Sequence, residues 1–285
     1  MKHQFKKQYG PFALIAGASQ GIGEAFAREI ARRGVNVILI SRRKNELEKI
    51  ANEIMEEFAI KALPIVLDLT QENVECEIKK IVTSYEINLL VYNAALSPIG
   101  SFFNPSLTTH REVIKLNCRG PMEWSYRLIP DMCKRGHGGV ILMSSLTAFQ
   151  GSPFVAHYGA TKAYNLSLAE ALWDECRAFN VHVMAVTAGA TSTPNFIASK
   201  PRINNIIKPP IQSPQEVAEQ SLNALHRNIP FFIPGWKNRL SSFVLRKLLP
   251  RSWAIKLIGQ MNRKMYDHES EKKTISTKKV RDQLN

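Results

Sequence analysis

The 285-residue sequence lacks the spacings on which metal sites and disulfide frameworks depend. Its seven histidines form no HExxH motif or paired-ligand spacing, and no CxxC motif occurs. The four cysteines are scattered along the chain, at Cys76, Cys118, Cys133 and Cys176. This pattern is typical of reduced thiols in a reducing compartment. We therefore expect neither a metal nor a disulfide bond.

Long apolar runs are also missing. No stretch of ~18 uncharged apolar residues occurs, so the sequence does not predict a transmembrane helix. The N-terminus turns from basic to apolar, as a secretory signal does, but the apolar run covers only Phe12 to Ala16 and ends in a glycine-rich turn. We interpret this run as a buried strand. The protein is expected to be cytoplasmic, or at most peripheral on a membrane.

Short apolar runs alternate with longer amphipathic segments through most of the chain. The runs are FALIA, VNVILI, ALPIVL, INLLVY, GGVILMSS and VHVMAV, which start at residues 12, 35, 62, 87, 138 and 181. Helices are expected near Glu24 to Arg33, Lys44 to Phe58 and Val74 to Tyr85. The alternation predicts an α/β fold, with a doubly wound, mostly parallel, Rossmann-like sheet covered by helices on both faces. Such sheets bind ligands at the carboxyl ends of their strands.

The segment GASQGIG follows the first expected strand and leads directly into a helix. Gly17, Gly21 and Gly23 allow a tight turn and a close approach to a pyrophosphate, and the helix N-terminus offers free N–H groups. Ser19 and Ile22 lie in the same turn, and we expect both to contact the nucleotide. An ordinary strand-to-helix turn is the alternative interpretation.

The residues after the second strand indicate which dinucleotide the site prefers. A site for NAD usually presents an acidic residue here for the ribose hydroxyl, whereas arginine accommodates the extra phosphate of NADP. Ser41 occupies this position, and Arg42 and Arg43 follow it. The pattern favours NADP(H), with a solvated basic loop as the alternative.

Tyr158 and Lys162 are four residues apart, so in a helix their side chains reach the same region of space. With the glycine turn, this pair makes the sequence resemble the short-chain dehydrogenases/reductases, from roughly residue 12 to residue 232. The family turn GxxxGxG and the family pair YxxxK are both met. The family serine, thirteen residues before the tyrosine, corresponds to Ser145, and the family's helical asparagine corresponds to Asn117 in KLNCRGP.

The resemblance implies a catalytic role for each of these four residues. Tyr158 would deliver a proton to the substrate oxygen, while Lys162 would lower the pKa of the phenol from its usual ~10 and hold the nicotinamide ribose. Ser145 would hydrogen-bond the substrate oxygen as charge develops. Asn117 would position a water that relays protons toward the lysine. The structural alternatives are a strand-end cap for the serine, satisfaction of buried backbone groups for the asparagine, and simple packing for the tyrosine.

Further cofactor contacts follow from the same resemblance. Asp68 matches the family acid near the adenine, although a turn-forming aspartate is the alternative. Leu69 would add a backbone contact, and Asn93 follows the fourth strand. Gly189 permits a close backbone approach to the nicotinamide, and Thr193 matches the family threonine that contacts its carboxamide.

The chain departs from the family pattern at two of these places. It reads YNAA at 92–95, where the family often has NNAG, which keeps one asparagine and small residues. It reads Ala188-Gly189 where proline-glycine commonly follows the sixth strand, which removes a rigid turn.

The segment from Ser192 to Ser213 lies where the family places a mobile lid over the substrate. Its apolar members Phe196, Ile197, Ile206 and Ile207 suggest an apolar partner, and a solvent loop with incidental isoleucines is an equal alternative. The expected substrate is a bulky apolar carbonyl or alcohol of lipid metabolism, such as a ketoacyl chain, a sterol or a retinoid.

A change in composition divides the chain near residue 234. We expect a dinucleotide-binding catalytic domain over 1–234, a basic amphipathic helical extension over 235–270 and a disordered tail over 271–285. Residues 235–285 contain 13 Lys or Arg against 4 Asp or Glu, a net +9 of the chain's +14. Two short cationic helices are expected on either side of Pro250, with apolar residues at helical spacing at Leu240, Phe243, Val244, Trp253, Leu257, Ile258, Met261 and Met265. They could lie on an anionic membrane, cover the substrate pocket or pack against a partner subunit.

Two classes of function are compatible with these features. The first is an NADP(H)-dependent oxidoreductase that interconverts a carbonyl and a secondary alcohol. The second is a non-catalytic nucleotide-sensing or nucleic-acid-binding protein on the same fold. The complete Ser, Tyr, Lys and Asn set favours the enzyme, and the basic segment has no aromatic stacking pattern, so no nucleic-acid partner is expected. The resemblance also implies a homo-oligomer built on the helices that carry Asn117 and Tyr158.

Overall fold

The computed structural model describes residues 2–71, 74–202 and 209–266 of the chain. Within them, seven parallel strands form one sheet in the order β3-β2-β1-β4-β5-β6-β7. Their bounds are β1 Phe12–Ala16, β2 Asn36–Ser41, β3 Ala62–Val66, β4 Ile87–Tyr92, β5 Gly138–Ser145, β6 Val181–Ala188 and β7 Phe231–Phe232. The predicted α/β fold and its first six strands are confirmed. The strand order reverses between β1 and β4, and the carboxyl ends of these strands define the crevice in which such sheets bind ligands.

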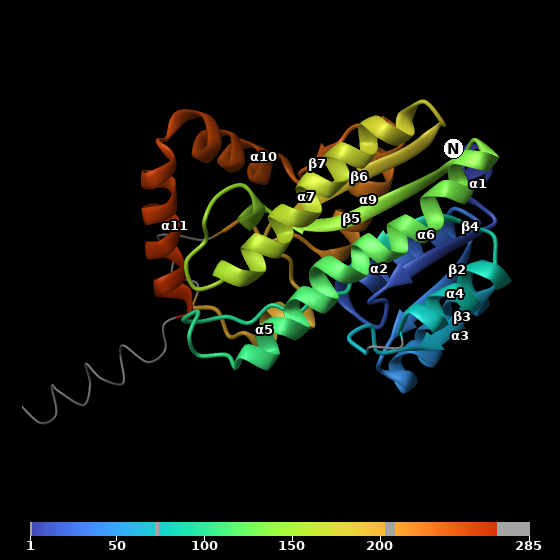
Figure 1. The fold of residues 1–285 in the computed structure, drawn as a ribbon, viewed down its shortest axis with the longest axis horizontal. Helices are drawn as coiled ribbons and strands as arrows, with labels where there is room; N and C mark the ends of the chain where they lie inside the picture. The colour runs from blue at the N-terminus through green and yellow to red at the C-terminus, as the bar shows by residue number, and fades with distance from the viewer. Residues whose placement is uncertain (1, 72–73, 203–208, 267–285) are drawn as a thin grey trace, which may run out of the picture.

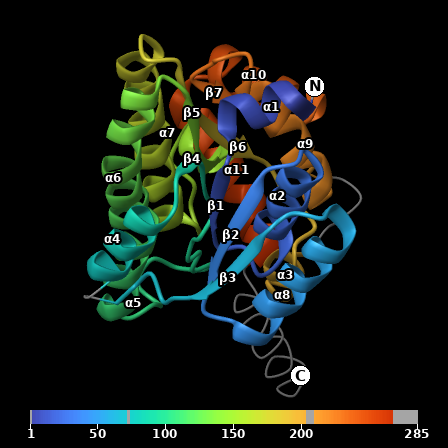
Figure 2. The same cartoon turned by 90° about the vertical axis from the view of Figure 1, so that its right-hand side faces the viewer.

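Helices cover both faces of the sheet (Figure 2). One face carries α2 (Gly21–Arg32), α3 (Lys44–Phe58) and α9 (Pro214–Leu225), and the other carries α4 (Val74–Ser84), α6 (Gly120–Arg135) and α7 (Ala156–Arg177). Alternate residues of a strand point to opposite faces, so Ile15 packs in one hydrophobic core and Leu14 in the other. Burial on both faces explains why the strands are almost continuously apolar.

The first helix, α1 (Lys2–Tyr9), was not expected from the sequence. Its basic residues face solvent, while Phe5 and Tyr9 are 1% and 0% exposed in the core. The Tyr9 hydroxyl lies 2.9 Å from Nδ1 of His182 at the amino end of β6. The helix therefore closes the end of the sheet opposite to the ligand crevice.

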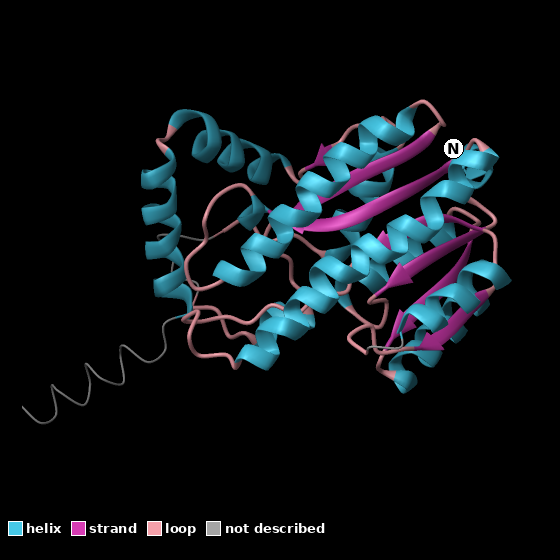
Figure 3. Cartoon of the chain, viewed as in Figure 1, coloured by secondary structure: helices cyan, strands magenta, loops and turns pink. Residues whose placement is uncertain are grey.

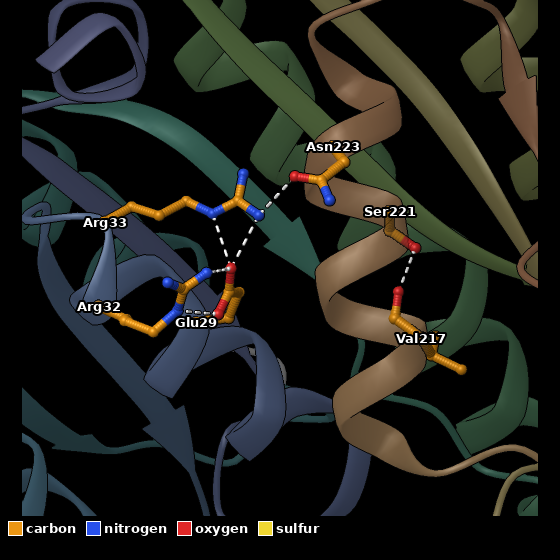
Figure 4. Close-up of polar contacts among 6 residues, drawn as sticks. All are labelled: Glu29, Arg32, Arg33, Val217, Ser221 and Asn223. Carbon is orange, nitrogen blue, oxygen red and sulfur yellow. Dashed lines mark hydrogen bonds and ion pairs between the residues drawn. The ribbon is translucent and has the colours of Figure 1, made fainter. Parts of the chain in front are cut away.

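Helices α2 and α9 are joined by a polar cluster, shown in Figure 4. Arg32 and Arg33 both donate to the Glu29 carboxylate, and Arg33 also donates to Oδ1 of Asn223 at 2.8 Å. Farther along α9, the Ser221 hydroxyl donates to the Val217 carbonyl at 2.6 Å. The contact between Arg33 and Asn223 fixes the C-terminal end of α2 on α9, while the N-terminus of α2 opens onto the crevice.

The remaining elements stand at the carboxyl edge of the sheet (Figures 1 and 3). They are α5 (Leu107–Ile114), the π-helical segment η1 (Lys115–Arg119), the 3₁₀ turn η2 (Leu146–Ala148), α8 (Pro194–Ala198), α10 (Trp236–Phe243), the π-helical segment η3 (Val244–Leu248) and α11 (Arg251–Tyr266). The two expected helices of the extension are present, with α11 beginning directly after Pro250. None of the described helices is long and apolar enough to cross a membrane.

The extension packs on the loops that follow β5 and β6. Asn262 of α11 donates to the Pro153 carbonyl at 2.8 Å, and the Arg202 amide donates to the Met265 carbonyl at 3.1 Å. The apolar residues of α11 do not form one buried face, because Met265 is buried while Trp253 is 66% exposed. The expected apolar lid residues Ile206 and Ile207, and the expected tail 271–285, lie outside the described residues.

Candidate active site

The glycine turn between β1 and α2 is tightly packed. Gly17 has φ +85°, and a methyl group there would lie 2.8 Å from the Ala94 backbone. A methyl group at Gly23 would lie 2.0 Å from the Gly17 carbonyl. Nδ2 of Asn93 donates to that same carbonyl at 3.0 Å, so the turn is held from β4 as well. Only glycine fits here, and the N-terminus of α2 is left facing the crevice, as a bound pyrophosphate requires.

Thr193, another expected cofactor residue, lies against this turn. A methyl group at Gly21, which has φ +61°, would be 3.0 Å from Cγ2 of Thr193. The Thr193 hydroxyl caps α8 by accepting from the Phe196 amide at 3.2 Å. Ile22 is half-buried and packs against the core. Gly189 lies against Asn238 of α10, whose side chain would be 2.7 Å from a methyl group at that position.

The end of β2 carries a cluster of polar side chains. The Ser41 hydroxyl donates to the Ser19 hydroxyl at 2.6 Å, and Nη2 of Arg43 donates to the same oxygen at 2.7 Å. Arg43 also donates to the side chain of Gln20. Arg42 is exposed and has no hydrogen bond or ion pair with any described residue. The cluster thus brings Ser19 of the glycine turn together with the serine and arginine expected to select the dinucleotide.

Asp68 and Leu69 follow β3. Oδ1 of Asp68 accepts from the amide and the hydroxyl of Thr70, at 3.0 and 2.7 Å. This is the turn-forming arrangement that the sequence left as an alternative. Leu69 is 6% exposed and packs in the core, so only its backbone is free to contact an adenine.

Three of the four expected catalytic side chains meet at the carboxyl end of β5. Ser145 ends this strand, and its hydroxyl lies near enough to the Tyr158 phenol on α7 to lower the pKa of that phenol. The Ser145 hydroxyl also accepts from the Thr147 amide at 3.2 Å. Lys162 is 3% exposed, and its Nζ lies 5.4 Å from the centre of the Tyr158 ring and donates to the Met143 carbonyl at 2.8 Å. The one-turn spacing on α7 therefore does bring the phenol and the ammonium to one place.

The expectation that Lys162 lowers the pKa of Tyr158 is wrong for this structure. Burial raises the pKa of Tyr158 to about 12, and the nearby Ser145 hydroxyl opposes that rise. Burial lowers the pKa of Lys162 to about 8, while Cys118 acts in the opposite direction. The physical reason is that desolvation disfavours both charged forms, and the lysine directs its ammonium at a backbone carbonyl.

Asn117, the fourth expected residue, is completely buried in the π-helical segment η1. Its Oδ1 accepts from the Leu96 amide and its Nδ2 donates to the Leu96 carbonyl, both at 2.9 Å. Nδ2 also lies 3.0 Å from Oγ1 of Thr161, the residue before Lys162. Its amide therefore satisfies buried groups, the structural alternative left open above, and it joins the loop after β4 to α7.

Several neighbours of the site carried no signal in the sequence. The Met143 carbonyl and the Cys118 thiol both act on Lys162, but neither belongs to a motif. Tyr92 could have been suspected, because it departs from the family pattern. Its phenol donates to the Leu116 carbonyl, next to Asn117.

Comparisons with known proteins identify the family of this chain. A family model described as short chain dehydrogenase matches residues 11–203. The 7beta-hydroxysteroid dehydrogenase of Clostridium sardiniense is 28% identical over 93% of this chain and 98% of its own length. Human very-long-chain 3-oxoacyl-CoA reductase is 26% identical over 92% of this chain and 83% of its own length. A solved structure from a study of 7beta-hydroxysteroid dehydrogenase stereoselectivity has a TM-score of 0.83 at 26% identity, covering 90% of this chain and 99% of that one.

The chain belongs to the short-chain dehydrogenase family. It is accordingly an oxidoreductase of carbonyl and alcohol groups that works with a nicotinamide dinucleotide. The glycine turn and the N-terminus of α2 fit such a cofactor, because the glycines allow a tight turn that leads directly into the helix N-terminus.

Proposed function

We propose that this protein is an NADP(H)-dependent reductase or dehydrogenase that interconverts a bulky apolar ketone and the corresponding secondary alcohol. The observation that carries the proposal is the grouping of two hydroxyl groups, those of Ser145 and Tyr158, beside the buried ammonium of Lys162. Two hydroxyl donors at the carboxyl edge of the sheet, close to a dinucleotide turn, are what a ketone oxygen requires as it gains negative charge.

The chemistry divides between the cofactor and this chain. A bound nicotinamide supplies hydride to the substrate carbon or accepts it. Tyr158 holds the proton that the substrate oxygen receives, and its raised pKa keeps the phenol protonated at neutral pH. Ser145 donates a hydrogen bond to the same oxygen, and Lys162 places a positive charge near it. Asn117 fixes α7 relative to the loop after β4, so that these groups keep their relative positions.

The preference for NADP(H) rests on the polar cluster at the end of β2. A guanidinium pairs strongly with a phosphate, and no acidic side chain stands at position 41 to compete for it. Arg42 is exposed with no competing partner among the described residues, and Arg43 is held over the glycine turn by Ser19. Together they would hold the ribose phosphate, while Ser41 leaves space for it.

The preference for a bulky apolar substrate rests on the relatives and on the loop after β6. The two relatives described above are named for a hydroxysteroid and a very-long-chain 3-oxoacyl-CoA. Phe196 and the 66% exposed Ile197 lie on α8, directly after Thr193. A steroid or a long acyl chain would cover these side chains and remove their apolar surface from water.

The test is a panel of ketones incubated with the protein and NADPH, in which consumption of NADPH is followed by its absorbance. The panel contains 7-oxosteroids, 3-oxoacyl-CoA compounds of increasing chain length, and small ketones as controls. We expect turnover of the steroid or long-chain compounds and little turnover of the small ketones. Turnover of the small ketones alone would contradict the assigned substrate class.

We also propose that α10 and α11 contact an anionic membrane surface. Residues 236–266 contain eight Lys or Arg and no Asp or Glu. Trp236 of α10, Leu248 of η3 and Trp253 of α11 are each more than 60% exposed, so apolar and cationic groups are available together on this part of the chain. Amphipathic cationic helices of this kind bind at lipid interfaces.

A homo-oligomer is proposed on separate grounds. The outer surfaces of α6 and α7 expose Met122, Tyr126 and Tyr164, by 41%, 76% and 39%. Aromatic residues and methionine are enriched at protein interfaces. We expect the wild-type protein to have at least twice the mass of one chain in solution, and Tyr126→Glu to reduce that mass to one chain. A wild-type monomer would exclude the assembly.

A further inference from the structure

Tyr92, which stands where the family often has asparagine, lies directly against Gly120. Tyr92 ends β4 with its side chain 1% exposed, and its phenol donates to the Leu116 carbonyl at 2.8 Å. That carbonyl belongs to η1, where the Gly120 amide donates to the Lys115 carbonyl five residues back, the wide spacing of a π-helix. The phenol thus satisfies a buried backbone acceptor in this segment.

Gly120 is required for a spatial reason. A methyl group at this position would lie 1.9 Å from Oη of Tyr92 and 2.7 Å from its Cζ. The Tyr92 ring has little room to move aside, because it is 1% exposed and lies in the same hydrophobic core as Trp124. Gly120 has an ordinary helical φ of −56°, and a glycine inside a helix costs ~0.5–1 kcal/mol relative to alanine. Its presence is therefore explained by the tyrosine and not by the backbone conformation.

Asn117 lies in the chain between Leu116 and Gly120, the two residues that Tyr92 contacts. Leu116, which accepts from Tyr92, is its immediate neighbour. The Asn117 amide in turn holds both backbone groups of Leu96 and contacts Thr161 on α7. A shift of η1 would therefore be transmitted to the helix that carries Tyr158 and Lys162.

We propose that Tyr92 and Gly120 form a mutually dependent pair that sets the position of η1 and so acts as a positioning element of the active site. Tyr92 supplies the hydrogen bond that orders the π-helical turn, and Gly120 supplies the space for the phenol. Neither residue touches the substrate. The proposal rests on the catalytic roles assigned above to Tyr158 and Lys162.

The first test removes the hydrogen bond but keeps the ring, with Tyr92→Phe. We expect kcat, for the ketone of the panel that is turned over fastest, to fall about fivefold to tenfold. The dissociation constant of NADPH should change by less than about twofold, because the glycine turn is untouched. Rates are expressed per NADPH-binding site, so that loss of folded protein does not lower kcat.

Tyr9→Phe is the matched control. Tyr9 is also fully buried and its hydroxyl also has one hydrogen-bond partner, His182, but it lies at the opposite end of the sheet. The Tyr9→Phe variant should have a lower melting temperature than the wild-type protein and an unchanged kcat. If Tyr92→Phe behaves in the same way, with a lower melting temperature and wild-type kcat, Tyr92 is only a core residue and the positioning role is excluded.

The second test addresses mutual dependence and needs no substrate. Gly120→Ala should lower the melting temperature severely or abolish NADPH binding, because the methyl group collides with the phenol. Asparagine is frequent in the family at position 92, and adding Tyr92→Asn to Gly120→Ala removes the ring. The melting temperature and the NADPH affinity of this double variant should return toward those of Tyr92→Asn alone. Additive losses in the double variant would overturn the pairing.

Tyr158→Phe separates this inference from the proposed function. If that variant keeps its activity, the assigned chemistry fails, while the melting temperatures of the Gly120 and Tyr92 variants still decide the pairing. If Tyr158→Phe is inactive and Tyr92→Phe is not impaired, the chemistry stands and the positioning role fails.

Discussion

The Ser145 hydroxyl at the end of strand β5 lies near enough to the Tyr158 phenol on helix α7 to lower the pKa of that phenol. The serine is held by the Thr147 amide, and the tyrosine is followed one turn later by Lys162, whose ammonium is fixed on the Met143 carbonyl. The strand and the helix thus present two hydroxyl groups and one cation at the same edge of the sheet. The pKa values of Tyr158 and Lys162 determine how the reaction should depend on pH.

The first prediction concerns the pH dependence of ketone reduction. Burial lowers the pKa of Lys162 to about 8 and raises the pKa of Tyr158 to about 12. The ammonium is therefore present below pH 8 and lost above it, while the phenol keeps its proton throughout. We expect kcat/KM for reduction to be level at lower pH and to fall about tenfold per pH unit well above pH 8.

His157→Gln is the control for this profile, since His157 adjoins Tyr158 and could be confused with the lysine. Burial and the neighbouring His110 lower its pKa below the ordinary value, so it titrates on the acidic side. The alkaline decline should persist in this variant. A reduction profile that stays level to pH 10 would show that the charge on Lys162 is not needed.

The second prediction concerns cofactor selection. Arg42→Ala should weaken NADPH binding about tenfold to a hundredfold, because a charge-assisted pair with the phosphate is lost, and should change NADH binding less than about threefold. Arg43→Ala should weaken both cofactors, since it also removes a donor to Ser19 beside the glycine turn. Ser41→Asp should shift the preference toward NADH.

Fluorescence titration with each cofactor measures these changes. Arg177→Ala, an exposed arginine at the far end of α7, is the control and should leave both affinities unchanged. Equal losses of NADPH and NADH affinity in Arg42→Ala would mean that this side chain does not recognise the phosphate.

The third prediction concerns membrane association of α10 and α11. Trp253→Ala with Lys256→Glu removes one exposed apolar side chain and reverses one charge, and should lower binding to phosphatidylserine-containing vesicles at least about tenfold. Arg246 is not a suitable target, because its guanidinium lies 3.9 Å from the ring centre of Phe149 and so faces the protein. Phe179→Ala, an exposed aromatic on another surface, is the control.

Vesicle sedimentation provides the measurement. Binding of the wild-type protein should fall with added salt and be absent with pure phosphatidylcholine. Failure of the wild-type protein to sediment with the anionic vesicles at low salt would assign these helices to protein contacts alone.

Much of the fold was predictable because the sheet is buried on both faces. A run such as INLLVY at β4 is apolar at nearly every position, and its burial on both sides leaves no other interpretation. Helix α1 was missed because it is only eight residues long and is stabilised by contacts distant in sequence, such as Tyr9 with His182. A periodic signal is weak over two turns. Strand β7 was missed for a similar reason, since two residues carry no alternation.

Within the site, the motifs predicted which residues meet but not their electrostatic state. The four-residue spacing predicted that Tyr158 and Lys162 are neighbours, and they are. The direction of the pKa change at Tyr158 depends on the burial of the phenol and on the nearby Ser145 hydroxyl, and neither effect can be read from spacing. The dependence of Gly120 on Tyr92 could not be predicted either. The two residues are 28 positions apart in the sequence, and their contact exists only in the folded chain.

The most direct test of the account is a comparison of wild-type protein with Tyr158→Phe, in which ketone reduction and NADPH affinity are measured on the same samples. Tyr85→Phe, at the end of α4 and far from the site, is the control for the loss of a tyrosine hydroxyl. Because the phenolic proton is needed only in the reaction, we expect kcat to fall at least about a hundredfold in Tyr158→Phe while the dissociation constant of NADPH changes less than about twofold. A Tyr158→Phe variant that keeps more than about a tenth of the wild-type kcat would contradict the role of Tyr158 as the proton donor.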